Sequence, residues 1–132
     1  MLLTIHDETA SGKILNGLTL DLLDETISVR ELIRSRVYQE VQDYNRKRAN
    51  QTQEFRGLVT PDDAEKTLNG VKLRTPRDID WKKQFDKACE SFERNGFFIL
   101  VDDRQAESLD EMIALKHNST VTFVKLMPLV GG

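Results

Sequence analysis

Few residues in this sequence are of types and spacings that could carry out chemistry. The chain of 132 residues has two histidines, His6 and His117, and a single cysteine, Cys89. The histidines lie far apart in sequence, and neither has a second metal ligand at helical spacing. Cys89 lies on an apolar helical stripe with no evident base beside it, which is typical of a small core residue rather than a nucleophile. We therefore expect no enzymatic activity, no metal site and no resident cofactor.

Paired acidic residues could form an acid–base dyad, but their positions favour structural roles. Carboxylates in turns accept local hydrogen bonds, and carboxylates at helix starts complement the helix dipole. All the pairs fall in expected turns or helix starts: Asp7-Glu8, Asp24-Glu25, Asp62-Asp63 and Asp102-Asp103. None of them predicts a catalytic site.

The most distinctive chemical feature is the C-terminal sequence MPLVGG, residues 127–132. It follows an alternating apolar run, Val121 to Leu126, that predicts a final strand. Gly131 and Gly132 have no Cβ, so their backbone can approach another surface closely and adopt unusual dihedral angles.

Composition and charge limit the possible classes of protein. The length fits one domain, and 39% hydrophobic with 31% charged residues is typical of a soluble globular protein. A net charge of -3 argues against a general nucleic-acid binder, which would usually be basic. We also expect no membrane span, no signal peptide and no intrachain disulfide, and hence a cytoplasmic location.

The first third of the chain predicts a β-hairpin followed by a helix. Residues 1–6 form an expected first strand and the alternating residues 18–22 a second strand. The segment DETASGK, residues 7–13, and the Asn16-Gly17 pair are two turn signals between them, which predict a long or bulged turn. Ser28 and Glu31 then form a capping box that begins a helix over about 28–46. Its apolar stripe recurs at helical spacing: Val29, Leu32, Ile33, Val37, Val41 and Tyr44.

The middle of the chain is polar and predicts two further helices. The basic cluster Arg46-Lys47-Arg48 could be a nucleic-acid patch, but cations complementing the last helical turn suit an acidic chain better. Thr60 and Pro61 predict the start of a short helix that ends at Asn69-Gly70. A longer helix is expected over about 80–95, with Gly96 as its C-terminal cap.

The last third predicts a return to sheet. The apolar run 97–101 is an expected strand, followed by a turn at Asp102-Asp103. A short helical or 3₁₀ turn is expected around 108–113 and another turn at 117–119. Residues 120–126 form the expected final strand, which leads into the tail.

This order of elements resembles the β-grasp fold of ubiquitin and its relatives, most closely over residues 97–132. The ending P-x-x-G-G, on Pro128, Gly131 and Gly132, is similar to that of the sulfur carriers of molybdopterin and thiamine synthesis. The bacterial ubiquitin-like modifiers lie between these groups, and the chain looks most like them. The expected fold is α+β, a β-grasp mixed sheet packed on one main helix. We expect a single domain over 1–132, with a two-helix insertion at about 47–95 and a flexible tail at 127–132.

The resemblance implies that the C-terminal carboxylate is the working group. An E1-like enzyme would adenylate Gly132 with ATP, Gly131 would thread a narrow channel, and the segment Pro128, Leu129 and Val130 would dock the tail. The product would be an isopeptide on a target protein or, alternatively, a sulfur-carrying thiocarboxylate. Implied partners are the E1-like enzyme, an E2-like conjugating enzyme, a deconjugating peptidase and target proteins, but no nucleic acid or membrane. A non-conjugated binding module is a further alternative.

The predicted strands also suggest a protein-binding patch. Phe98 and Leu100 alternate with the residues that must face the core, and Val124 belongs to the same set on the last strand. In ubiquitin this face of the sheet binds other proteins. Either these side chains form such a patch, or the expected helix with Trp81, Phe85 and Phe92 covers it. We expect partial cover, because those aromatic residues also need burial.

Overall fold

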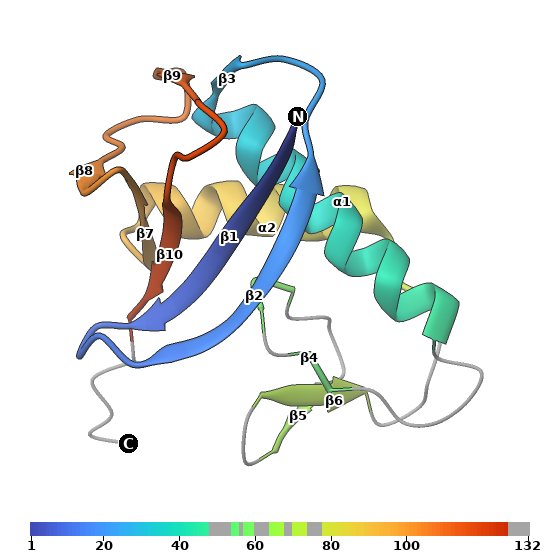
Figure 1. Cartoon of the computed structure of the whole chain (residues 1–132). Helices are drawn as coiled ribbons and strands as arrows, with labels where there is room; N and C mark the ends of the chain where they lie inside the picture. The colour runs from blue at the N-terminus through green and yellow to red at the C-terminus, as the bar shows by residue number, and fades with distance from the viewer. Residues whose placement is uncertain (48–53, 56, 60–63, 68–69, 74–77, 127–132) are drawn as a thin grey trace. The chain divides into compact units, whose positions relative to one another are not determined.

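The computed structural model describes residues 1–47, 54–55, 57–59, 64–67, 70–73 and 78–126 (Figure 1). The chain divides into two compact units, which we call unit 1 (Met1–Leu32 with Cys89–Gly132) and unit 2 (Ile33–Ala88). The single domain expected over 1–132 stays a prediction.

The described residues contain two helices, α1 (Val29–Lys47) and α2 (Trp81–Glu93). Both helices begin in one unit and end in the other. The strands of unit 1 are β1 (Leu2–Thr9), β2 (Ile14–Asp21), β3 (Thr26–Ser28), β7 (Phe97–Val101), β8 (Arg104–Gln105), β9 (Met112–Ala114) and β10 (Val121–Lys125). The strands of unit 2 are β4 (Glu54–Phe55), β5 (Ala64–Lys66) and β6 (Val71–Leu73).

Unit 1 is built on a five-stranded mixed sheet with the order β2-β1-β10-β7-β8. The last strand, β10, lies in the interior of this sheet, parallel to β1 and antiparallel to β7 (Figure 1). β3 and β9 form a separate antiparallel pair. The predicted α+β class and mixed sheet are therefore confirmed.

Alternation of side chains gives the sheet two different faces. The inner face carries the core of unit 1, which includes Leu3, Ile5, Ile99, Val121 and Phe123, each at most 1% exposed. The register pairs Ile5 of β1 with Val121 of β10, and Phe123 of β10 with Ile99 of β7, so β10 connects the apolar side chains of its two neighbours. The outer face carries the alternate residues of the same strands.

Helix α1 forms where the sequence predicts it. The Ser28 hydroxyl accepts a hydrogen bond from the Glu31 amide at 3.1 Å, which caps the helix start. The first two amides of the helix, those of Val29 and Arg30, have no acceptor within the helix. They donate to the carbonyls of Glu111 and Leu109, both at 2.9 Å. The whole predicted apolar stripe is buried: Val29, Leu32, Ile33, Val37, Val41 and Tyr44.

The first hairpin turns within the first of the two predicted turn segments, residues 7–13, and not at the second. Gly12, at φ +90°, lies in the turn, and the Thr9 amide donates to the Lys13 carbonyl at 2.9 Å. Asn16 and Gly17 lie inside β2, where they pair with β1, and are not the predicted turn. The turn needs only one residue with positive φ, and Gly12 supplies it.

The insertion corrects a prediction more substantially. The helix expected over 60–69 is wrong, because Ala64–Lys66 is strand β5 of a three-stranded sheet with the order β4-β6-β5. The Thr67 amide donates to the Gly70 carbonyl at 2.9 Å, and the Gly70 amide donates to the Thr67 hydroxyl at 3.1 Å. These bonds close the β5–β6 hairpin. The described part of the insertion therefore contains one helix, α2, and not two.

Side chains of α1 anchor the insertion within unit 2. The Glu40 carboxylate accepts the amides of Leu58 at 3.1 Å and Val59 at 2.7 Å. It also lies 3.6 Å from the guanidinium of Arg36, whose side chain is fully buried. One turn further on, Asn45 accepts the Ile79 amide at 2.9 Å and donates to the Ile79 carbonyl at 3.2 Å. Two separate parts of the insertion are thus held by one helix.

Helix α2 ends in a Schellman motif. The Gly96 amide donates to the Ser91 carbonyl at 2.7 Å, and the Asn95 amide donates to the Phe92 carbonyl at 3.1 Å. The left-handed residue is Asn95, at φ 63°, rather than the predicted Gly96. A Cβ at position 96 would lie 2.2 Å from the Ser91 hydroxyl and 3.2 Å from the Ser91 carbonyl, so a larger residue there would force Ser91 to move.

The third predicted strand and its turn are confirmed, and the segment that follows is corrected. Asp102 and Asp103 both have positive φ, 49° and 69°, the backbone of a tight hairpin turn between β7 and β8. The helical turn expected around 108–113 is instead a turn followed by strand β9. β9 pairs with β3, and this pairing uses the residues just before α1.

Candidate functional site

The sheet determines where the C-terminal tail begins. β10 ends at Lys125, in the interior of the sheet, and the Leu126 amide donates to the Gly96 carbonyl at 3.4 Å. Leu126 is 37% exposed. The predicted tail residues, Pro128, Leu129, Val130, Gly131 and Gly132, lie outside the described residues. The described part of the site is therefore its root.

Covalent geometry limits the reach of this tail. Seven residues, 126–132, follow the end of β10. A fully extended segment of that length spans at most about 25 Å. An enzyme that acts on Gly132 must therefore bring its reactive centre within about 25 Å of the end of the sheet.

The structure brings the three predicted patch residues together on the outer face of the sheet. Val124 lies directly opposite Phe98, and Leu100 lies opposite Thr122. Phe98, Leu100 and Val124 are each half-buried. On the other side of β10, Glu8 pairs with Val124 and His6 with Thr122, so polar groups border the apolar side chains. This arrangement provides a small apolar strip with a polar edge.

The expected cover of this strip by α2 is not observed for Phe92. Its ring contacts Phe97, with centroids 5.7 Å apart, and Phe97 in turn stacks on Phe123 at 5.8 Å. Phe97 and Phe123 belong to the inner face, opposite to the strip. Phe92 is therefore buried in the core of unit 1 and not against the apolar strip.

Sequence reasoning missed a polar network around Glu111. Its carboxylate accepts the Glu107 amide at 2.8 Å and the Arg104 guanidinium at 2.5 Å. Asp110, the preceding residue, pairs with Arg30 of α1 at 3.0 Å. The hydrogen bond from the Glu107 amide, followed by that from Arg104, lowers the pKa of Glu111 below its ordinary value of 4.5. The network holds the 107–111 loop against β8 and the start of α1.

This pKa predicts a pH dependence of stability. Because the folded state lowers the pKa of Glu111, its ionised carboxylate stabilises the fold above about pH 4.5. That contribution should be lost as the pH falls through the lowered pKa. We expect Glu111→Gln to have a lower free energy of unfolding than the wild type near neutral pH. Between pH 5 and pH 3, roughly the range in which carboxylates titrate, the variant should lose less of this free energy than the wild type does. Urea unfolding at a series of pH values measures this.

Glu107→Gln is the matched control for this experiment. Glu107 lies in the same loop, its side chain is exposed, and its contribution to the network is its backbone amide. It should therefore follow the wild-type pH profile. Parallel profiles for Glu111→Gln and the wild type would contradict the assignment.

The other chemically capable residues are separated from one another. His6 lies on the outer face of β1 and His117 in an exposed turn, while Cys89 is buried in α2 as its apolar stripe predicts. Asp7 lies within β1 and is buried, so its predicted place in a turn is wrong. Within the described residues, no group of His, Cys, Asp and Glu is arranged to hold a metal ion. Neither α1 nor α2, over the part described, is long and apolar enough to cross a membrane.

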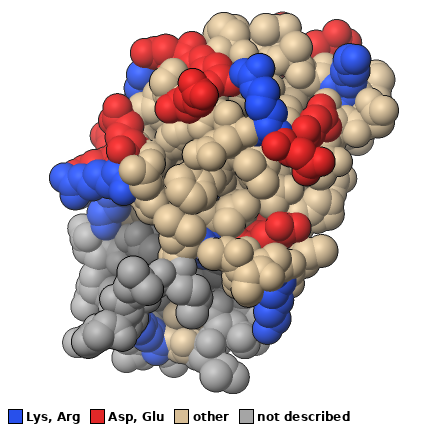
Figure 2. Space-filling view, turned by 90° about the vertical axis from the view of Figure 1, so that its left-hand side faces the viewer, with Lys and Arg blue, Asp and Glu red and all other residues tan. Residues whose placement is uncertain are grey.

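Charge is divided unequally between the two units. Unit 1 contains 13 acidic and 6 basic residues, and unit 2 contains 9 acidic and 13 basic residues, so their net charges are -7 and +4. Figure 2 shows acidic side chains, with basic ones among them, around an uncharged middle on the upper part of one face. The mild overall charge of -3 conceals this division. A partner that contacts one unit therefore meets a different charge from a partner that contacts the other.

Comparison of the chain with protein families, curated proteins and solved structures finds no match.

Proposed function

We propose that this protein is a small ubiquitin-like modifier. An E1-like enzyme adenylates the carboxylate of Gly132, and the activated tail is then conjugated to target proteins. This carboxylate is either present from synthesis or freed by removal of following residues. The proposal rests on one observation, that the interior strand β10 leads within seven residues to the Gly131-Gly132 pair.

The topology of unit 1 is compatible with a β-grasp fold. It begins with an antiparallel hairpin, continues into helix α1, and ends with a strand inserted between the first strand and β7. Its final strand is parallel to its first strand. In such a sheet the root of the tail is held on both sides by backbone pairing, while the residues beyond it can enter an enzyme.

The chemistry follows from the carboxylate. One of its oxygens attacks the α-phosphorus of ATP and displaces pyrophosphate, which gives an acyl-adenylate. A thiolate of the enzyme displaces AMP to give a thioester, and a lysine amine of the target displaces the thiolate to give an isopeptide. An E2-like enzyme would carry the thioester, and a deconjugating peptidase would hydrolyse the isopeptide. In this scheme Pro128 limits the freedom of the tail before it docks, and Leu129 and Val130 contact the channel.

Two alternatives share parts of this proposal. In a sulfur carrier a sulfide donor would attack the same acyl-adenylate and displace AMP, which leaves a C-terminal thiocarboxylate, and the P-x-x-G-G ending favours this alternative. In a non-conjugated binding module the strip of Phe98, Leu100 and Val124 would be the working surface. Intact mass of the protein from its native host separates the three. A sulfur-for-oxygen gain indicates the carrier, and covalent adducts on other proteins indicate the modifier.

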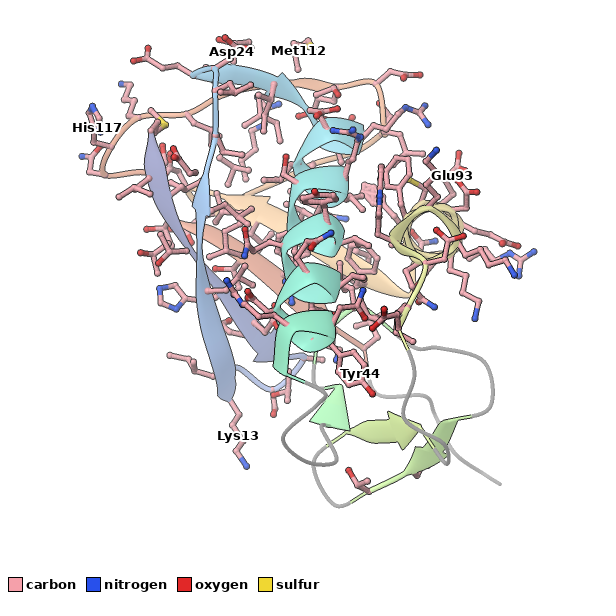
Figure 3. The ribbon with its side chains drawn as sticks, turned by 90° about the vertical axis from the view of Figure 1, so that its right-hand side faces the viewer. Lys13, Asp24, Tyr44, Glu93, Met112 and His117 are labelled. Atoms are coloured by element: carbon pink, nitrogen blue, oxygen red, sulfur yellow. The ribbon has the colours of Figure 1, made fainter. Side chains whose placement is uncertain are left out.

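Removal of Gly132 tests the proposed activation. We expect the full chain to support ATP–pyrophosphate exchange by a matching E1-like enzyme, and the chain lacking Gly132 to lose this activity at least a hundredfold, since a one-residue misplacement of a reacting group removes its alignment. His117→Ala, in the exposed turn that precedes β10 and is labelled in Figure 3, is the control and should exchange normally, because the tail leaves the other end of that strand. Equal exchange by the shortened chain would refute the proposal.

A further inference from the structure

Unit 2 carries a surface of aromatic and basic side chains that the tail chemistry does not use. We call Arg34 and Tyr38 of α1, with Trp81, Lys82 and Phe85 of α2, the aromatic–basic surface. The Tyr38 and Trp81 rings meet edge to face, with centroids 5.3 Å apart, and Trp81 lies 6.4 Å from Phe85. The guanidinium carbon of Arg34 lies 5.0 Å from the centre of the Trp81 ring. All five residues belong to unit 2.

This surface is accessible despite its apolar content. Tyr38 is 44% exposed, Trp81 and Phe85 are half-buried, and Arg34 and Lys82 are exposed. Trp, Tyr and Arg are the residue types that most often dominate the energy of protein–protein binding. In this surface Tyr38 and Arg34 both already contact Trp81. Binding would therefore cost little additional side-chain entropy.

The charge around this surface is mainly basic. In the part of α2 that belongs to unit 2, Lys82, Lys83 and Lys87 are exposed and outnumber the one acid, Asp86, while Glu90 and Glu93 of the same helix belong to unit 1. Asp80, just before the helix, accepts the Lys82 amide at 3.0 Å as the helix cap. With the net charge of +4 on unit 2, this composition is complementary to an acidic ligand.

We propose that the aromatic–basic surface docks an acidic segment of a partner protein. Carboxylates of the segment meet Arg34 and Lys82, and one apolar side chain rests against Trp81 and Tyr38. A nucleic acid would also meet the charge of unit 2, but its affinity comes mainly from neutralised phosphates, and the chain as a whole carries a net charge of -3.

Trp81 reports on this binding directly, because it is the only tryptophan in the chain. The probe is a short synthetic peptide of Glu and Asp with one central Leu, added to the full-length protein while tryptophan emission is followed. A second peptide, with Gln and Asn in place of Glu and Asp, tests the need for charge. We expect a saturable change with the acidic peptide, weakened by added salt, and none with the neutral peptide.

Charge reversal at Lys82 distinguishes binding from folding. Lys82→Glu places an acid in the first turn of α2, which has none, so it should favour the helix dipole and leave the fold intact. We expect it to weaken peptide binding about fivefold. Lys13→Glu makes the same change of charge in unit 1 and should bind normally. Arg34→Lys keeps the charge and should retain more affinity than Arg34→Glu.

Several results would overturn the proposal. They are an absence of saturable change with the acidic peptide, equal binding of the neutral peptide, and equal weakening by Lys82→Glu and Lys13→Glu. Saturable binding of a single-stranded oligonucleotide without binding of the acidic peptide would assign the surface to nucleic acid instead.

Discussion

Glu40→Ala should lower the free energy of unfolding by about 3–5 kcal/mol, the usual loss when one partner of a buried ion pair is removed. The Glu40 carboxylate satisfies the amides of Leu58 and Val59 and lies beside the guanidinium of Arg36. The side chain of Arg36 is 0% exposed. Alanine would therefore remove the acceptor for two backbone amides and the carboxylate beside a buried cation. Equilibrium unfolding in urea measures the change.

Two further variants make this experiment specific. Glu40→Gln keeps one side-chain oxygen as an acceptor but loses the charge, so it should fall between Glu40→Ala and the wild type. Gln42→Ala truncates an exposed side chain on the same helix and should change the free energy of unfolding by less than about 0.5 kcal/mol. If Glu40→Ala changed the free energy of unfolding as little as Gln42→Ala, the hydrogen bonds from Leu58 and Val59 to Glu40 would not stabilise the protein.

Phe123→Ala should destabilise the protein by about 3–5 kcal/mol, the range for a large aromatic side chain lost from a core. Phe123 is fully buried at the centre of the inner face, lies opposite Ile99 and stacks on Phe97. Its neighbours belong to rigid strands, which limits how far they can close the space that alanine leaves. Urea unfolding followed by circular dichroism measures this loss.

Leu100→Glu is the matched variant on the outer face of the same sheet. Leu100 is half-buried and pairs with Thr122 and Gln105, so a charge there remains beside polar groups and water. We expect it to cost less than about 1.5 kcal/mol, although the change of side chain is more drastic. If the outer strip binds a partner, the folded variant should lose that binding. Unfolding by Leu100→Glu would show instead that this face is covered.

The helices and strands whose apolar residues recur at regular spacing were predictable from the sequence. The helix expected over 28–46 is Val29–Lys47, and the strand expected over 97–101 has those same bounds. In both, a continuous apolar pattern agrees with a local start signal, and burial in the folded protein follows the same pattern. The juxtaposition of Phe98 and Val124 also followed from simple alternation, once the two strands were paired.

The segments without a regular spacing of apolar residues were not predictable in the same way. Asn69-Gly70 ends a helix or closes a hairpin with equal ease, and the segment around Ala64–Lys66 has no apolar stripe to decide between them. Arg36 and Glu40 look like ordinary solvent-facing residues of a helix, because their burial depends on residues 57–59 of the insertion. The aromatic–basic surface likewise needs two helices that are far apart in sequence.

The pairing of β10 on both sides has a mechanical consequence. Five residues of β10 pair with β1 and the same five pair with β7. A force applied to the tail acts along the strand. It therefore shears the backbone hydrogen bonds of all these pairs at the same time. Opening the sheet from an edge would instead separate one pair after another. If Gly132 is conjugated as proposed, the attached protein would therefore pull on a strand that is paired on both sides.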